Sequence, residues 1–196
     1  MLRYILLGFL SYRPMTGYEL KTFMDTSTSH FWHAYHSQIY TTLRKLEEEG
    51  LLTSQQEDPA DRLSKRIYTL TPAGRAELND WLGKPLTEMP QVKEDLLVRV
   101  FFSGQRDAGA VLEELRYQRR LHQEKLAVYR KIDEHDMMPA DPDLPEHAHK
   151  TMVREAQFWR ATLHFGISYE TMYLTWLDDV IAWLEGEREA TLPLSA

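Results

Sequence analysis

One segment, from His36 to Gly50, restricts the possible folds of this chain because it predicts a helix with a specialised outer face. Ile39, Leu43 and Leu46 are spaced by four and three residues, so they form one narrow apolar stripe. The side chains away from that stripe are small, hydrogen-bonding or cationic over the first two turns, and become acidic only in the last turn. A helix that enters the major groove of DNA needs short polar residues and arginine near its N-terminus. The alternative is an ordinary amphipathic surface helix.

The segments around this helix predict an order of helix, helix, helix, hairpin, helix. They are an apolar helix over residues 2–11, a helix opened by a Thr16–Glu19 capping box, a Ser/Thr-rich break at 26–29, the helix ended by Gly50, strands over 51–56 and 65–70, and a helix with Thr71 as N-cap and Pro72 at N1 that ends near Gly83. This order is typical of a winged helix-turn-helix. The predicted fold is mostly α with a small β-hairpin wing, and it combines this N-terminal domain with a C-terminal antiparallel helical dimerisation domain.

The formal net charge of −7 at first argues against a nucleic-acid partner. The acidic excess is uneven, however: residues 1–82 hold 9 Lys and Arg against 10 Asp and Glu, whereas residues 83–196 hold 14 against 20. A DNA-binding surface needs a local basic patch rather than a basic protein. The charge therefore does not exclude DNA binding by the first half.

Several short motifs resemble the PadR family of transcriptional regulators. They are Ile39-Tyr40 with Leu43, Leu46-Glu47, Gly50-Leu51, and Arg66 with Tyr68-Thr69-Leu70-Thr71 and Gly74. The run through Phe31-Trp32 and His36-Ser37-Gln38-Ile39-Tyr40 is similar to the long-chain branch, which carries a C-terminal helical domain of the virulence-activator type. The resemblance is close over residues 2–82 and looser over 93–186. Thr41 departs from the pattern, because many members have proline there.

We expect four parts in the chain. They are a DNA-binding domain over residues 1–83, a linker over 84–92 that contains Pro85 and Pro90, a helical domain over 93–186, and a tail over 187–196. In the helical domain, helices are expected over 93–103, from Asp107 to about Asp133, and from about His147 to near Glu185. Three prolines, at 139, 142 and 145, prevent a continuous helix between the last two.

The last expected helix carries an aromatic and apolar stripe at spacings near three and four: Phe158, Phe165, Tyr169, Met172, Trp176, Val180 and Trp183, widened by Leu163, Tyr173 and Leu177. A three-helix unit of this size cannot bury all of these faces within itself, so the surplus is expected to pack against a second copy of the chain. The alternative is a helix packed wholly against its own domain. The resemblance to PadR proteins implies a homodimer through these C-terminal helices.

The expected DNA contacts lie on the helix and on the wing. They are Ser37, Gln38, Tyr40, Thr41, Arg44 and Lys45 on the helix, with Arg62, Lys65 and Arg66 on the wing for phosphates. Each of these residues has an alternative interpretation as a solvated surface side chain.

An effector site is a further hypothesis. In the phenolic-acid-responsive branch of the family, the effector pocket resembles the place where Glu19, Trp32 and His36 are expected in this chain. His164 and Tyr169 are candidates for another wall of that pocket. A planar aromatic acid would stack on Trp32 and hydrogen-bond His36. His36-Ser37-Gln38 also has a simpler interpretation as a structural turn. A metal site at His30, His33 and His36 is not expected, because on an α-helix a three-residue spacing turns each ring about 60° from the previous one.

Other function classes lack support in the sequence. There is no cysteine, no apolar run of the roughly 20 residues that a membrane span needs, and no glycine-rich phosphate loop or Gly-x-Ser-x-Gly motif. We therefore expect a cytoplasmic regulator without cofactor or enzymatic activity. It would bind double-stranded operator DNA as a homodimer, most simply as a repressor, and a small effector would release it. Two alternatives stay open: a winged-helix protein–protein adaptor, and a ligand-binding or metal-sensing module that does not bind DNA.

Overall fold

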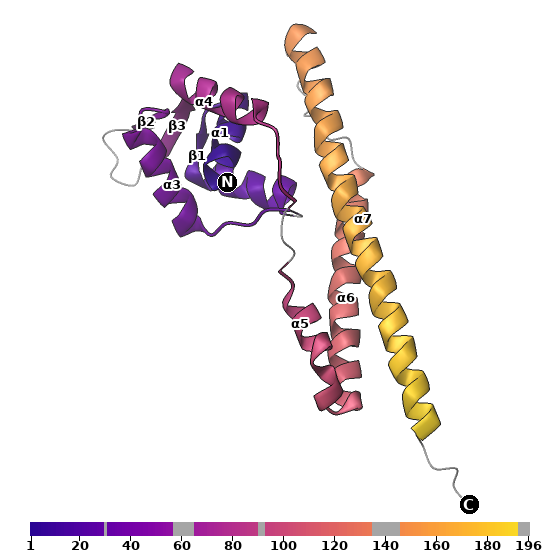
Figure 1. Ribbon diagram of the computed structural model, residues 1–196. Coiled ribbons are helices and arrows are strands. Elements are labelled where there is room, and N and C mark those ends of the chain that lie inside the picture. Colours follow the sequence, from indigo (N-terminus) through magenta and orange to yellow (C-terminus); the bar gives the residue numbers. More distant parts are fainter. Residues whose placement is uncertain (30, 57–64, 90–92, 135–145, 192–196) are drawn as a thin grey trace, which may run out of the picture. The chain divides into compact units, whose positions relative to one another are not determined.

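The computed structural model describes residues 1–29, 31–56, 65–89, 93–134 and 146–191. The chain divides into two compact units, Met1–Pro90 (unit 1) and Gln91–Ala196 (unit 2). Unit 1 contains α1 (Leu2–Tyr12), β1 (Met15–Thr16), α2 (Gly17–Phe23), a π-helical turn (Met24–Thr28), α3 (His36–Glu48), β2 (Leu52–Gln56), β3 (Arg66–Leu70) and α4 (Pro72–Gly83) (Figure 1). Unit 2 contains α5 (Asp95–Phe101), a 3₁₀ turn (Ser103–Gln105), α6 (Ala108–Asp133) and α7 (Glu146–Thr191).

The ends of the helices follow from local side-chain chemistry. Thr16 accepts a hydrogen bond from the Glu19 amide at 3.1 Å, and the Glu19 carboxylate accepts one from the Thr16 amide at 2.8 Å, which completes the predicted capping box. Thr71 caps α4 and Pro72 occupies its first turn. Gly50 has a φ of 72°, the left-handed conformation expected after α3. Asp107 caps α6, as predicted.

The sheet of unit 1 is larger than the predicted hairpin. Its strand order is β1-β3-β2, and both pairings are antiparallel. The pairing of Met15 with Tyr68 ties the start of α2 to the hairpin. A two-residue strand carries no alternation that a sequence can show, which explains why β1 was missed.

The sequence pattern predicts a break in the helix at the Ser/Thr-rich residues 26–29, and this prediction is wrong. Met24–Thr28 continues α2 as a π-helical turn, in which the hydroxyl groups of Thr26, Ser27 and Thr28 donate to carbonyl oxygens three or four residues earlier. These bonds satisfy the hydroxyls inside the helical segment, so the residues do not end it.

The core of unit 1 is apolar and closes on itself. Its most buried side chains come from every helix and from the sheet: Leu6, Leu7, Leu10, Met15, Leu20, Met24, Ile39, Leu43, Leu46, Leu52 and Leu78. Tyr4 of α1 stacks on Trp81 of α4 with ring centroids 4.4 Å apart, which closes the side next to α4.

Unit 2 is built on two long antiparallel helices that lie side by side (Figure 1). Arg116 pairs with Glu185, Arg119 with Asp178, and Lys125 with Glu170. Residues later in α6 thus contact residues earlier in α7, as antiparallel helices require. Val111, Leu112 and Leu115 of α6 pack with Tyr173, Leu177 and Ile181 of α7 and with Leu96 of α5. The last helix runs to Thr191, beyond the end expected near Glu185.

A carboxylate lies within this helix pair. Glu170 is 1% exposed, and its oxygens lie 2.5 Å from Nδ1 of His122 and 3.1 Å from Nζ of Lys125. Burial raises the pKa of Glu170, but the hydrogen bonds from His122 and Lys125 outweigh it, so that the pKa lies below its usual value. The His122 ring also stacks on Tyr173 with centroids 3.9 Å apart. The sequence pattern gave no sign of this buried polar group.

Across the described residues, no helix combines the length and hydropathy needed to cross a membrane.

Candidate nucleic-acid interface

The α3 helix has one buried and one exposed face, as its sequence pattern predicts. Ile39 and Leu43 are fully buried and Leu46 is 1% exposed, so the helix has a fixed rotation against α1 and α2. The six predicted helix contacts all lie on the exposed side: Ser37, Gln38, Tyr40, Thr41, Arg44 and Lys45. This face offers hydroxyl, amide and cationic groups in its first three turns, which are the groups that pair with base edges and phosphates.

Gln38 has a structural task besides any contact. Its Oε1 accepts a hydrogen bond from the Tyr35 amide at 3.0 Å, which satisfies a backbone donor at the start of α3. Thr42 donates to the Gln38 carbonyl at 2.7 Å. The amide nitrogen of Gln38 is therefore the part of the side chain suited to an outside acceptor.

Tyr40 lies against the first residue of α2. A Cβ placed on Gly17 would come within 2.5 Å of Cε1 of the Tyr40 ring, so glycine is needed for this close approach. Tyr40 is still 47% exposed. One ring thus sets the spacing between α2 and α3 and also presents its edge to solvent, which the sequence pattern alone did not show.

The basic residues of α3 lie next to its acidic last turn. Nε of Arg44 lies 3.8 Å from Glu48, and both side chains are about two-thirds exposed or more, at 71% and 68%. Such an exposed pair is weak, so Arg44 can exchange it for a phosphate. Lys45 is also exposed.

The described part of the wing adds two cations. Arg66, the first residue of β3, and Lys65, just before it, are both exposed. The guanidinium of Arg66 lies 3.8 Å from the Glu47 carboxylate of α3. Arg62, the third predicted wing contact, lies outside the described residues.

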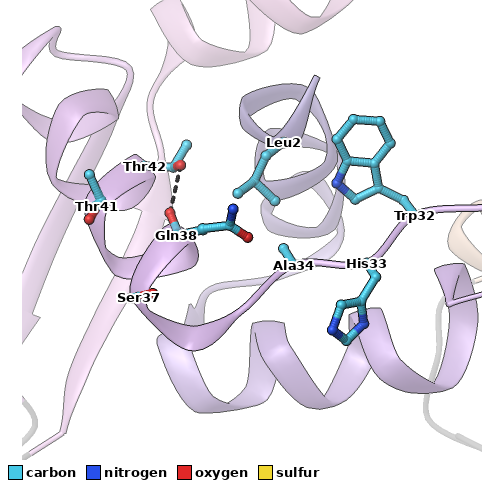
Figure 2. A pocket seen from close by; sticks show the side chains of 8 residues that line it. All are labelled: Leu2, Trp32, His33, Ala34, Ser37, Gln38, Thr41 and Thr42. Atoms are coloured by element: carbon cyan, nitrogen blue, oxygen red, sulfur yellow. Dashed lines mark hydrogen bonds between the residues drawn. The ribbon is translucent and has the colours of Figure 1, made fainter.

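A shallow groove runs beside the first turn of α3 and has a volume of about 400 Å³. Figure 2 shows its lining, with the Gln38 side chain pointing from α3 toward Leu2. The lining residues are Leu2, Trp32, His33, Ala34, Ser37, Gln38, Thr41 and Thr42. The groove therefore joins Trp32, a predicted effector contact, to three predicted DNA contacts.

The other predicted effector residues have different surroundings. The Glu19 carboxylate is held by the Thr16 amide, which lowers its pKa, and by Arg13 at 3.0 Å. His36 is exposed and is not part of the groove lining. In unit 2, His164 lies 3.2 Å from Asp133, and the Tyr169 hydroxyl lies 3.5 Å from Glu94.

In the part of the chain that the structure describes, no group of three or more His, Asp or Glu side chains is arranged so that it could hold a metal ion. His30, one of the three histidines weighed for such a site, lies outside that part.

The predicted dimerisation stripe on α7 divides into two sets. Phe158, Phe165, Met172 and Trp183 are 60%, 63%, 54% and 59% exposed. Tyr169, Trp176 and Val180 are partly buried against the core between α6 and α7. The three residues expected to widen the stripe are buried: Leu163, Tyr173 and Leu177. The surplus apolar surface therefore lies on a seven-residue repeat of α7, at 158, 165 and 172.

Two family descriptions match the chain, one for each unit. The transcriptional regulator PadR-like family matches residues 6–80, and the virulence activator alpha C-terminal family matches residues 92–185. The chain thus combines a PadR-like domain with a C-terminal domain of the virulence-activator type. Members of the PadR-like family regulate transcription through a DNA-binding winged helix, and the exposed face of α3 lies in the matched domain.

Two known regulators are similar to this chain in sequence over nearly their whole length. The negative transcriptional regulator PadR of Bacillus subtilis is 28% identical over 94% of this chain and 97% of its own. A probable transcriptional regulator of Mycobacterium tuberculosis is 29% identical over 88% of this chain and 92% of its own.

Solved structures are also similar. Bacillus subtilis PadR in complex with operator DNA has a TM-score of 0.74 at 27% identity, covering 93% of this chain and 98% of that one. The same protein in complex with p-coumaric acid has a TM-score of 0.70 at 26% identity, covering 94% and 98%. The Vibrio cholerae virulence activator AphA has a TM-score of 0.72 at 26% identity, covering 95% and 99%.

Proposed function

We propose that this chain is a transcriptional repressor that binds a palindromic operator as a homodimer. The observation that carries the proposal is the two-sided α3 helix of a PadR-like domain. Its apolar side is locked into the core, while Ser37, Gln38, Thr41 and Arg44 stay exposed on the other side. A rigid helix with exposed polar groups near its N-terminus suits readout of base edges in the major groove.

The dimer is supported by apolar side chains that one chain leaves uncovered. Phe158, Phe165 and Met172 recur every seven residues along α7, which is the spacing of a helix–helix contact. Burying them against a second copy would remove apolar surface from water. Two α3 helices related by a twofold axis would then meet half-sites roughly 34 Å apart.

Release by a small effector completes the proposal. The solved complex of the Bacillus subtilis relative with p-coumaric acid supports a planar aromatic acid as the ligand class. We assign contacts to Trp32 and His36 in unit 1, with His164 and Tyr169 in unit 2 as further candidates. The fixed position of Glu19 in its capping box makes it the weakest candidate. An effector releases DNA by preferring the conformation that does not fit the operator, and typical couplings of about 1–3 kcal/mol would weaken binding about 5- to 150-fold.

A gel shift against the promoter region of the protein's own gene tests DNA binding. With about six phosphates neutralised per dimer, the logarithm of affinity should fall with the logarithm of salt at a slope near −5. Arg44→Glu should abolish the shift, whereas Arg130→Glu, an exposed site on α6, should preserve it. Addition of p-coumaric acid should weaken the shift of the wild-type protein. Equal binding by the two variants would contradict the proposal.

The adaptor alternative and the ligand-module alternative give different results in this experiment. An adaptor has no use for cations on α3 and the wing, so Arg44→Glu would leave its partner binding intact. A ligand-binding or metal-sensing module that does not bind DNA would also tolerate Arg44→Glu but would lose its function in His36→Ala. The proposed repressor is the one case in which charge reversal on α3 removes the activity.

A further inference from the structure

Glu47 connects α3 to both strands of the wing. It lies in the last turns of α3 and is partly buried, with 27% of its side chain exposed. Its Oε1 accepts a hydrogen bond from the Ser54 hydroxyl of β2 at 2.5 Å, and its Oε2 lies 3.8 Å from the Arg66 guanidinium of β3. A single carboxylate of α3 thus contacts the two strands that carry the wing.

These contacts fall on one face of the hairpin. Ser54 is paired with Tyr68, and Gln56 with Arg66, so Ser54 and Arg66 are two positions apart in the ladder and point to the same side. The buried Tyr68 is the cross-strand partner of Ser54, and its pKa is raised by burial and by the charge of Glu47. The carboxylate therefore fixes the hairpin at two successive positions rather than at one point.

Charge alone gives Glu47 an unfavourable role. A carboxylate beside a phosphate-binding surface repels DNA and partly neutralises Arg66, so its removal should improve binding if electrostatics were its whole effect. Its hydrogen bond to Ser54 has the opposite consequence. A wing held at one place on α3 brings its cations to the phosphates without a loss of conformational freedom on binding.

We propose that Glu47 is a positioning residue, which holds the wing in register with α3 so that Lys65 and Arg66 reach phosphates at the same time as α3 enters the groove. This rests on the proposed DNA binding. The hydrogen bond to Ser54 is the part that fixes the position, and the ion pair with Arg66 is secondary because it is longer and half-exposed.

Three substitutions of the full-length protein separate position from charge. Glu47→Ala removes the hydrogen bond and the charge, and should weaken operator binding about tenfold and make the salt slope shallower by about 2, one wing contact per protomer. Glu47→Gln removes the charge but keeps an acceptor for Ser54, and should restore affinity to within about twofold. Glu48→Ala is the matched control, because it removes an equal charge one residue further along α3, and it should bind as tightly as the wild type or tighter.

A readout without DNA separates this proposal from the proposed function. Amide hydrogen exchange in residues 52–56 and 66–70 should become faster in Glu47→Ala and stay unchanged in Glu47→Gln and Glu48→Ala. This result would support the positioning role even if the wild-type protein did not bind the operator. Should Glu47→Ala fail to fold, Ser54→Ala breaks the same bond from the other side and should give the same loss of affinity and protection.

Two results would overturn the proposal. Equal affinities of Glu47→Ala and Glu47→Gln would show that only the charge acts. Unchanged exchange in the hairpin of both Glu47→Ala and Ser54→Ala would show that the bond does not hold the wing.

Discussion

The two units of this chain bury side chains in opposite ways. Unit 1 closes an apolar core on itself and presents polar groups of α3 outward, whereas unit 2 joins α6 to α7 through a narrow apolar core flanked by ion pairs and leaves phenylalanines of α7 exposed. A unit that is complete by itself can present a surface to a ligand. A unit that leaves a regular apolar repeat uncovered is suited to association with its own copy. The difference indicates how the two units divide DNA recognition and assembly.

The largest expected effect concerns the exposed repeat of α7. Phe165→Ser together with Met172→Ser should weaken dimerisation by about 4–8 kcal/mol, because four partly exposed apolar side chains per dimer lose a burial of about 1–2 kcal/mol each. Sedimentation at micromolar concentration should show a shift from dimer to monomer.

The matched control lies in unit 1. Leu82→Ser replaces an apolar side chain of α4 that is 64% exposed, and it should leave the dimer unchanged. Equal dissociation by both variants would contradict the division between the units.

The next largest effect concerns the buried carboxylate of unit 2. Glu170→Ala leaves the Lys125 ammonium and the His122 ring without their buried hydrogen-bond acceptor and should lower the free energy of unfolding by about 3–5 kcal/mol. Glu185→Ala breaks the exposed pair with Arg116 and should lower it by less than about 1 kcal/mol. Urea unfolding of both variants measures the difference, and similar losses would mean that burial does not strengthen the central pair.

Acid should weaken the same contact. The pKa of Glu170 in the folded protein lies below its ordinary value, although burial alone would raise it, because His122 and Lys125 donate to the charged form. Its contribution to stability is therefore fully present above the unfolded value of about 4.5, and is lost as pH falls through the lower folded value. The stability difference between the wild type and Glu170→Gln should thus shrink as pH falls below about 4.5. A constant difference down to pH 2 would contradict this assignment.

The smallest expected effect concerns a single backbone angle in unit 1. Gly50→Ala forces a Cβ into the left-handed conformation at a φ of 72°, which costs about 1–2 kcal/mol. No atom outside its chain neighbours lies within 4 Å of that Cβ, so the loss should come from the backbone alone. Gly83→Ala meets equally open space at the end of α4 and should have a smaller effect on the melting temperature.

The sequence predicted the features that depend on nearby residues. The Thr16 and Asp107 caps, the stop at Gly50 and the buried side of α3 are local consequences of side-chain type and spacing. The same local signals predicted the winged helix-turn-helix order of unit 1, and the resemblance to the PadR-like family implied the same fold.

Other features depend on partners distant in the sequence, and the pattern could not show them. The apolar stripe of α7 was expected as one surface, but Tyr169, Trp176 and Val180 are partly buried against the core of unit 2, whereas Phe158 and Phe165 stay exposed. The link from Glu47 to Ser54 and the packing of Tyr40 on Gly17 likewise need the folded chain. For the candidate site, the exposed residues were predicted, whereas the contacts that hold them in place were not.

One distance tests the central claim, a twofold assembly that holds two α3 helices at the spacing of successive grooves. The chain has no cysteine, so Thr41→Cys provides a single thiol for a spin label on the exposed side of α3. Double electron–electron resonance on the DNA-free dimer should give a distribution of distances between the two labels that includes roughly 34 Å, one turn of duplex. Two results would contradict the account. One is the absence of dipolar coupling between labels at micromolar concentration. The other is a narrow distance distribution centred far from about 34 Å that does not shift when an aromatic acid is added.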